Sequence, residues 1–517
     1  MKIISKEHFV KSLPTLILLT TALSLSAATT RYVNLNSTNP VPPFTEWSIA
    51  ATNIQDAVDA AVAGDEIIVT NGVYSVGGRT TGSGSTDWIS NRVAVTKAVR
   101  VISVNGPGST LISGYQVPGT TNGYQAVRCV YLGVGAMLSG FTLTNGATAS
   151  STPAPDINLR GGGVYGELQA CLVSNCVLVG NAASMKGGGA YQVTLVDCLV
   201  SNNVAISGGG GSASSSIKKC TFVGNSANSG GGTEGSQSEY SWFLGNRAAA
   251  LGGGAYGGGL TNCIVVGNSA ISGGGAYGSS MLNCTIVSNS ALHEGGIGGS
   301  SRLFNCVVYF NSGGNFQSAI FFYSCCTTPL PSIWNGNITN EPAFVDFGSG
   351  NYRLQSNSPC INAGNSAYVS GATDLDGNPR IAGGRLDIGA YEFQGGGLSG
   401  FTAWLWQFGQ PTDGSADFTD PDGDRANNWQ EWQTATVPTN ALSALRLLTP
   451  QTVGTNLVVT WQSVTNKTYF LERSTALATN ALFLPLASNL VGRAGFTTVT
   501  DTNAASAGPR FYRVGVQ

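Results

Sequence analysis

The chain has 517 residues, of which 71 are glycine and 10% are charged, and its formal net charge is −2. This length exceeds one compact core of roughly 100–200 residues, and a hydrophobic content of 42% excludes a disordered chain. The near-zero net charge offers no electrostatic footprint for nucleic acid, so we expect no nucleic-acid partner.

The first 28 residues have the features of a Sec signal peptide. Three lysines within the first 11 residues precede an apolar run from Leu13 to Leu25, and small residues follow at 26–28. The run is shorter than the ~20 residues that a membrane span needs, so cleavage after Ala28 is predicted. The mature chain is then expected to be exported, to contain no transmembrane segment, and to be extracellular or associated with the surface of a bacterial cell.

A capping helix is predicted at the start of the mature chain. Residues 53–62 have the apolar spacing of an amphipathic helix, which Gly64 ends, and a strand is predicted at 66–70. A solenoid must cover its exposed strand edges, and this helix is the expected lid. The segments 93–104 and 136–144 are expected to form less regular first coils.

A repeat of about 22 residues dominates the chain from residue 161 to residue 316. Cysteines recur in steps of 21 or 22, with Ser241 in one slot: Cys176, Cys198, Cys220, Cys263, Cys284 and Cys306. An asparagine stands five residues after each slot: Asn181, Asn203, Asn225, Asn246, Asn268, Asn289 and Asn311. Glycine clusters keep the same period, beginning at Gly161, Gly187, Gly209, Gly230, Gly252, Gly273 and Gly295. A fixed period of this length predicts a solenoid.

The position two residues after each cysteine slot is always apolar, so it shares the inner face of a strand with the cysteine. The period suits three short strands and three turns, with right-handed winding. We therefore predict an all-β chain in which residues 29–394 form a right-handed parallel β-helix with caps. Stacking at ~4.8 Å makes the asparagine column structural, and it favours buried thiols over disulfides in the cysteine column. The pairing of the cysteines outside this column is left open: Cys129, Cys171, Cys325, Cys326 and Cys360.

A second column contains aromatic residues four positions after the start of each glycine cluster. Its members are Tyr165, Tyr191, Ala213, Glu234, Tyr256, Tyr277 and Gly299. Aromatic rings at successive coils could stack on the faces of sugar rings, and Trp242, on the expected outer face, would extend that platform. The alternative is that these rings stiffen a turn or fill the core.

The coils contain no evident catalytic group. Hydrolases require paired carboxylates, and polysaccharide lyases combine acidic calcium ligands with a basic residue. Neither an Asp-Asp pair nor a cluster of three aspartates occurs between residues 161 and 316. If the coils are catalytic, Glu234, Glu239 and Arg302 are the first candidates.

Residues 395–441 are predicted to form a glycine-rich linker followed by a calcium loop. The segment 420–431 places oxygen ligands at loop positions 1, 3, 5, 7, 9 and 12, contributed by Asp420, Asp422, Asp424, the carbonyl of Ala426, Asn428 and Glu431. Ca²⁺ prefers such hard ligands. Arg425 stands where these loops place a glycine, which weakens the prediction, and an acidic solvated loop is the alternative.

Residues 442–517 alternate apolar and polar positions over several short segments. Strands are expected around 457–461, 469–472 and 510–514, and together they predict a small β-sandwich.

Several of these segments resemble known families. The residues from Ile54 to Tyr74 resemble the start of pectate-lyase-like β-helix proteins, and Cys220–Gly232 is similar to repeats of polymorphic outer-membrane adhesins. The segment Asn351–Glu392 resembles the choice-of-anchor Q module of secreted bacterial β-helix proteins. The calcium loop is similar to dockerin and thrombospondin-repeat loops, and residues 442–517 are similar to fibronectin-type modules.

The sequence thus favours an exported, non-catalytic β-helix that is adhesive or binds a polysaccharide or cell-surface glycan. A polysaccharide lyase or hydrolase acting on acidic glycans is the first alternative, and a structural element of a surface layer is the second.

Overall fold

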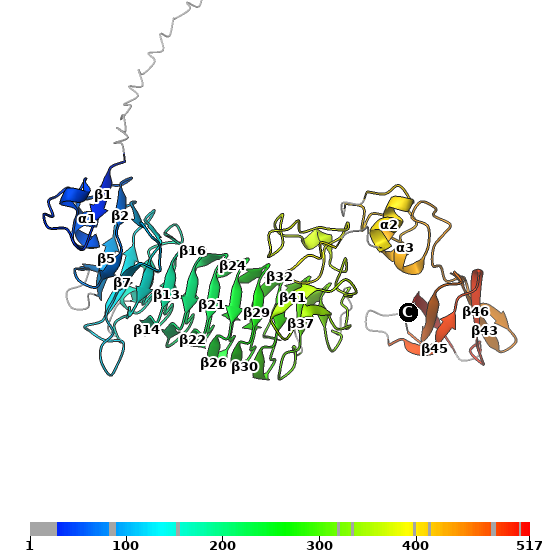
Figure 1. Cartoon of the computed structure of the whole chain (residues 1–517). Helices are drawn as coiled ribbons and strands as arrows, with labels where there is room; N and C mark the ends of the chain where they lie inside the picture. Colours follow the sequence, from blue (N-terminus) through cyan, green and yellow to red (C-terminus); the bar gives the residue numbers. More distant parts are fainter. Residues whose placement is uncertain are drawn as a thin grey trace, which may run out of the picture.

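The structure is a computed structural model that describes residues 28–81, 89–150, 156–317, 321–331, 336–395, 400–411, 415–476, 482–505 and 508–516. Residues 1–27 lie outside this set, so the signal peptide stays a prediction. Figure 1 shows a rod of stacked strands with α1 (Ile54–Ala60) at one end. Beyond its other end lie a helix pair, α2 (Gly400–Gln407) and α3 (Asn428–Thr434), and a set of antiparallel strands. Short 3₁₀ helices span Trp47–Ile49, Asp156–Asn158 and Ser366–Tyr368.

The rod is a right-handed parallel β-helix, as predicted. Within the described residues its strands form four long sheets, named A to D here, and each regular coil adds one strand to each sheet. All neighbours in these sheets run parallel except β4 and β5.

The strands of sheet A, in order along the rod, are β1 (Thr30–Val33), β2 (Glu66–Val69), β6 (Arg100–Ser103), β9 (Met137–Ser139), β12 (Leu172–Ser174), β16 (Thr194–Val196), β20 (Ser216–Lys218), β24 (Gln237–Glu239), β28 (Gly259–Thr261), β32 (Ser280–Leu282), β36 (Arg302–Phe304) and β38 (Phe321–Tyr323). Those of sheet B are β3 (Gly72–Tyr74), β7 (Thr110–Ser113), β10 (Thr142–Thr144), β13 (Val177–Val179), β17 (Leu199–Ser201), β21 (Thr221–Val223), β25 (Trp242–Leu244), β29 (Ile264–Val266), β33 (Thr285–Val287), β37 (Val307–Tyr309) and β39 (Cys326–Thr327). Those of sheet C are β4 (Arg79–Thr81), β5 (Ile89–Val95), β8 (Val127–Leu132), β11 (Val164–Gly166), β15 (Ala190–Tyr191), β19 (Ser212–Ala213), β23 (Thr233–Glu234), β27 (Ala255–Tyr256), β31 (Ala276–Tyr277) and β35 (Ile297–Gly298). Those of sheet D are β14 (Ala182–Ala183), β18 (Val204–Ala205), β22 (Ser226–Ser229), β26 (Arg247–Leu251), β30 (Ser269–Ser272) and β34 (Ser290–His293).

The columns read from the sequence line the interior of the rod. Cys220 and Phe222, for example, are 1% and 0% exposed, and Phe222 stacks on Phe243 of the next coil with ring centroids 5.1 Å apart. All eleven cysteines are buried free thiols, including those outside the column. The expected three strands per coil are too few, because the residues after the asparagine column add the fourth sheet, D.

The glycine clusters form the turn that leads into sheet C. Gly187 has φ +70°, and the next glycine, Gly188, lies so close to the carbonyl of Val204 in the following coil that a Cβ would not fit. Two successive positions therefore require glycine, one for its backbone angle and one for space.

Helix α1 closes the N-terminal end of the rod. The side chain of Asn53 accepts a hydrogen bond from the amide of Asp56 and caps the helix. Val58 is buried in the core that continues through the coils, and Gln55 bonds the amide of Ala94 at 2.7 Å. The lid thus contacts the edge of the first coils with both an apolar face and a polar group.

Residues 340–393, named the closing module here, fold back over the outer face of sheet B. Two antiparallel strands, β40 (Phe344–Asp346) and β41 (Asn351–Leu354), share a buried apolar cluster with Ile264 and Val307 of the coils. The amide of Ala390 donates to the hydroxyl of Thr285 at 3.0 Å. This packing covers the outer face of the last coils.

The buried polar residues of the closing module hold its own backbone. Asp374 accepts hydrogen bonds from the amides of Asp376, Asn378 and Glu392, and Asp387 accepts from those of Asn362 and Phe393. The acidic residues of the motif that resembles an anchor module therefore have a structural role, which is to hold the backbone of the closing module.

The segment 395–441, predicted to contain a glycine-rich linker and a calcium loop, also contains the helix pair, which begins at residue 400. Phe401 and Leu405 of α2 pack with Ala416 and are flanked by Trp429 and Trp432. The sequence prediction missed both helices.

The C-terminal residues form two three-stranded antiparallel sheets. The strands are β42 (Gln451–Val453), β43 (Asn456–Ser463) and β46 (Gly495–Asp501) in one sheet, and β45 (Leu484–Val491), β44 (Thr468–Ser474) and β47 (Phe511–Val516) in the other. Val459, Trp461, Tyr469 and Leu471 form a buried cluster that unites residues of both sheets. This arrangement is compatible with the predicted small sandwich.

Candidate functional site

The tyrosine column lies on sheet C. Its side chains point to the face of the sheet opposite to that of core residues such as Val164. The register pairs Tyr131 with Tyr165, Tyr165 with Tyr191, and Tyr256 with Tyr277. Ring centroids within these pairs are 5.8, 5.5 and 6.0 Å apart, and the rings are stacked. Each ring therefore covers a face of its neighbour, and sugar rings could reach mainly the ring edges.

Arginines hold the N-terminal half of this column. The guanidinium of Arg128 is fully buried, donates to the carbonyl of Gly161 at 2.8 Å, and lies 5.0 Å from the ring centroid of Tyr165. Arg160 lies at the same distance from the ring of Tyr191 and donates to its hydroxyl at 2.5 Å. Burial lowers the pKa of Arg128 to about 10 and raises the pKa of Tyr165. These contacts support a stiffening role for the column.

The column is interrupted at Ala213, and Glu234 from the next coil fills the gap. The carboxylate of Glu234 packs over Gly208 and forms an ion pair with Lys186, with Nζ and Oε1 2.8 Å apart. The last slot belongs to Gly298 rather than Gly299, because Glu294, with φ +59°, takes the place of the first glycine of that cluster.

Trp242 lies elsewhere, on the outer face of sheet B, where a cavity of about 530 Å³ separates the coils from the closing module. We name this cavity the Trp242 cleft. Residues 373–377 of the closing module form one wall of the cleft. The wall on the coil side consists of Lys218, Lys219, Cys220, Thr221, Tyr240 and Trp242. The expected common platform of Trp242 and the tyrosine column is therefore not formed, because the two occupy different sheets.

The turn between sheets A and B presents the residues of the cleft. Lys219 and Tyr240 occupy equivalent turn positions with φ +53° and +50°. The hydroxyl of Tyr240 lies against Gly371, where a Cβ would not fit. Trp242 pairs in register with the smaller Thr221 of the preceding coil, so the two side chains form a step in the wall.

The carboxylates near the cleft already have partners. Both oxygens of Asp374 accept main-chain hydrogen bonds, and Asp376 binds the guanidinium of Arg353 at 2.5–2.6 Å. Glu239, on the neighbouring strand β24, lies 3.8 Å from the Nζ of Lys218. The cleft thus contains aromatic rings and lysines, and the carboxylates near it are hydrogen-bonded or ion-paired within the protein.

The three residues proposed for catalysis are not brought together. Glu234 lies on sheet C, whereas Glu239 lies on sheet A. Arg302 lies on β36, three strands beyond β24 in sheet A, which is about 14 Å at the usual spacing. No pair among them is placed to act on one bond.

Sequence reasoning missed Lys218, Lys219 and Tyr240 as site residues. The signal was present, because Asn175, Asp197, Lys219, Tyr240 and Asn262 each stand directly before a cysteine slot and share one turn position. Lys219 and Tyr240 are larger than the Asn and Asp residues at the other positions. The closing module lies opposite these two residues across the cleft.

The predicted calcium loop brings its acids together. Carboxylate oxygens of Asp420, Asp422 and Asp424 lie within 4.8 Å of one another. Glu431, on α3, is fully buried, and burial followed by the charges of these aspartates raises its pKa to about 7. Arg425 has φ +80°, the backbone angle for which such loops use glycine, and its amide donates to Asp420 at 2.9 Å.

The other two predicted ligands lie in the same loop. Ala426 donates its amide to Asp424 at 2.7 Å. Asn428 is fully buried and donates to the carbonyl of Ala416 at 2.7 Å, which leaves its side-chain oxygen directed elsewhere.

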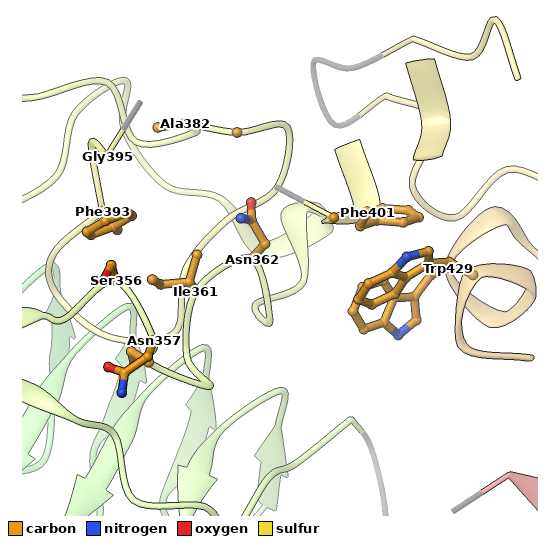
Figure 2. Close-up of a pocket in the computed structure, with 13 residues that line it drawn as sticks. Ser356, Asn357, Ile361, Asn362, Ala382, Phe393, Gly395, Phe401 and Trp429 are labelled. Carbon is orange, nitrogen blue, oxygen red and sulfur yellow. The ribbon is translucent and has the colours of Figure 1, made fainter. Parts of the chain in front are cut away.

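A second hollow, of about 540 Å³, lies between the closing module and the helix pair. Figure 2 shows Ile361 and Phe393 on one side of it and Phe401 and Trp429 on the other. Residues 396–399, which connect the two sides, lie outside the described residues, and we assign this hollow no function.

Comparison with protein-family models found no match, and no curated protein matches the chain. Solved structures with a similar arrangement include the pectate lyase Pel9A, at 14% identity and a TM-score of 0.42, covering 71% of this chain and 97% of that chain. A rhamnogalacturonan lyase matches at 12% identity and a TM-score of 0.38, covering 74% and 100%. Tailspike protein 2 of Escherichia coli O157:H7 bacteriophage CAB120 matches at 10% and 0.31, covering 95% and 65%. At these values the likeness identifies no residue of the site, and the proposals below rest on this chain's own geometry.

Proposed function

We propose that the chain is an exported, non-catalytic protein that binds an acidic polysaccharide in the Trp242 cleft. The observation that carries this proposal is the grouping of Trp242 and Tyr240 with Lys218 and Lys219 along one wall of a cavity of about 530 Å³. In the part of the chain that the structure describes, no helix is long and apolar enough to cross a membrane.

The chemistry of this wall suits a sugar acid. Aromatic rings present apolar faces to the C–H groups of sugars. The ammonium groups of the two lysines would attract the carboxylates of uronic acids, in a cleft whose acidic neighbours are already paired or hydrogen-bonded. The tyrosine column is a weaker candidate, because its rings cover one another.

We also propose that the chain does not cleave the polysaccharide, because the carboxylates of the cleft are already bonded within the protein. A hydrolase would need two free carboxylates at the bond to be cleaved, whereas Asp374 and Asp376 are committed to main-chain amides and to Arg353. The alternative, a lyase or hydrolase, predicts release of unsaturated or reducing products. A structural surface-layer element predicts neither binding nor turnover.

The test measures binding of polygalacturonate and of a neutral β-glucan to the mature chain by calorimetry, and assays the same mixtures for products. We expect Trp242→Ala to weaken polygalacturonate binding roughly tenfold and Lys219→Glu to remove most of the preference over the neutral glucan. Trp406→Ala is the matched control, because Trp406 is 70% exposed on α2, outside the cleft.

Three results would overturn the proposal: equal binding by wild type and Trp242→Ala, no binding of either polysaccharide, or release of products. The last result would favour the enzyme alternative, and product release that survives Trp242→Ala would place catalysis outside the cleft.

A further inference from the structure

The loop 420–431 contains buried oxygen atoms that have no hydrogen-bond donor. They are Oδ2 of Asp422, Oδ2 of Asp424, Oδ1 of Asn428, and both Oε1 and Oε2 of Glu431. A buried oxygen without a partner costs about 1–3 kcal/mol, and more when it is charged. Five such atoms in twelve residues, beside a cluster of three aspartates, indicate a missing positive partner.

The chemistry of these atoms selects the kind of cation. All of them are carboxylate or amide oxygens, and the loop contains neither histidine nor cysteine, which disfavours zinc and copper. Glu431 is fully buried, and neither of its carboxylate oxygens has a hydrogen-bond donor. An irregular loop that wraps many oxygens around one centre suits Ca²⁺ better than the small, octahedral Mg²⁺.

Asp417, just before this loop, and Trp429, near the end of the loop, also build a socket. The amide of Trp429 donates to the carbonyl of Asp417 at 3.0 Å, which joins the last part of the loop to the residues that precede it. Arg385 of the closing module enters there. Its guanidinium lies 3.6 Å from the ring centroid of Trp429, and its Nε lies 3.9 Å from a carboxylate oxygen of Asp417.

Arg385 is almost fully buried in this socket. Its side chain is 4% exposed, its Nε donates to the carbonyl of Gly364 at 2.6 Å, and burial lowers its pKa to about 10. A buried guanidinium needs partners of this kind, since burying it without them is costly. The socket is therefore stable only while Asp417 and Trp429 hold their relative positions.

We propose that residues 420–431 bind one Ca²⁺, and that this ion, by fixing Trp429 relative to Asp417, builds the socket through which Arg385 docks the helix pair on the closing module. Asp420, Asp422, Asp424, Asn428 and Glu431 supply side-chain ligands. This inference does not depend on glycan binding, and either can fail without the other.

The first experiment measures the ion. The mature chain, stripped with a chelator, is titrated with CaCl₂ in a calorimeter, and Tb³⁺ luminescence excited through tryptophan gives a second readout. We expect one site per chain. Glu431→Gln and Asp424→Asn should each weaken binding roughly 10–100-fold. Glu341→Gln, which alters an exposed carboxylate of the closing module, should leave binding unchanged.

The second experiment measures docking by hydrogen exchange of the full mature chain with and without Ca²⁺. We expect Ca²⁺ to slow amide exchange in 416–435 and also in 384–388 of the closing module. Arg385→Gln should retain the single Ca²⁺ site and the protection of 416–435 but lose the calcium-dependent protection of 384–388.

Three results contradict the inference. Absence of saturable Ca²⁺ binding to the wild type, or binding unaffected by both loop variants, would overturn the site. Calcium-independent exchange in 384–388 of the wild type would overturn the coupling, whatever the state of the variants.

Discussion

Each asparagine of the internal column from Asn181 to Asn289 bonds the coils on both sides of it. In Asn246 the side-chain nitrogen donates to the carbonyl of Phe222 and to Asn268, while the side-chain oxygen accepts from the main-chain and side-chain nitrogens of Asn225. All four bonds are 2.9–3.0 Å long and lie in the interior. The ladder therefore satisfies buried polar groups that the stacking of coils would otherwise leave without partners.

We expect Asn246→Ala to lower the free energy of unfolding by about 3 kcal/mol, because it removes the hydrogen bonds of the Asn225 amide, of one side-chain N–H of Asn225 and of the Phe222 carbonyl. Each unsatisfied group costs about 1–3 kcal/mol, reduced by local relaxation. Chemical denaturation followed by tryptophan fluorescence would measure the effect. Asn228→Ala, on an exposed position of β22, is the control and should change the free energy by less than about 0.5 kcal/mol. Equal midpoints for the two variants would contradict a structural role for the column.

At the level of single residues, the sequence predicts the repeated positions well and the exceptions poorly. The period places Cys220 and Phe222 in the core, because alternation along a strand is local. It cannot place Lys219 or Tyr240 in a cleft, because the opposite wall comes from residues more than 130 positions later. It also misplaces the last slot of the tyrosine column, where Glu294 adopts a backbone angle usually left to glycine.

The secondary-structure elements at the C-terminal side of the coils were the hardest to predict. Helix α2 has only eight residues, and its apolar side chains find their partners in α3, beyond the loop. Short helices are marginal without tertiary packing, so their local signal is weak. The loop predicted to bind calcium, in contrast, was recognised from the spacing of its acids alone, and the structure brings its three aspartates together. Calcium binding itself stays a prediction.

The closing module buries more negative than positive charge. Its buried acids are Asp374, Asp387 and Glu392, and Nη1 of the buried Arg380 lies 3.7 Å from Glu392. The second buried arginine of the module, Arg385, pairs with Asp417 instead. Desolvation, followed by the negative charge of Asp387, raises the pKa of Glu392, and desolvation raises the pKa of Asp387. The folded module thus favours the protonated form of these groups.

This arrangement predicts that the closing module loses stability as the pH rises. Both pKa values are raised from 3.8 and 4.5, so the folded state holds protons that the unfolded chain has released. The stabilising contribution is complete below about pH 4 and falls as the pH increases through neutrality. Hydrogen exchange at about pH 5 and about pH 8, corrected for intrinsic rates, should show weaker protection of 372–392 at the higher pH. Glu392→Gln should flatten the dependence while lowering stability overall, whereas Glu341→Gln should retain it.

On the scale of the whole molecule, each coil contacts mainly the coils before and after it, as in other solenoids. Residues 199–220 form one complete coil, since Thr221 pairs with Leu199 in register and repeats its position. Removing this segment joins Cys198 to Thr221 and leaves the order of the four sheets intact. The deletion also replaces Lys219 beside Tyr240 by its equivalent in the preceding coil, Asp197.

We therefore expect the chain lacking residues 199–220 to fold, with a midpoint of thermal unfolding within about 5 °C of the wild type. Removing 199–208 instead deletes β17 and β18 and leaves a partial coil of residues 209–220, which supplies no strand to sheets B and D. That chain should not fold normally, because the coils on either side can no longer stack on each other in register. Circular dichroism measures both outcomes. If the proposed function holds, the chain without 199–220 should also lose polygalacturonate binding, because its cleft presents a carboxylate where the wild type presents an ammonium group. A folded deletion variant that binds as tightly as the wild type would show that the two lysines do not select the ligand, even though the rod tolerates the loss of a coil.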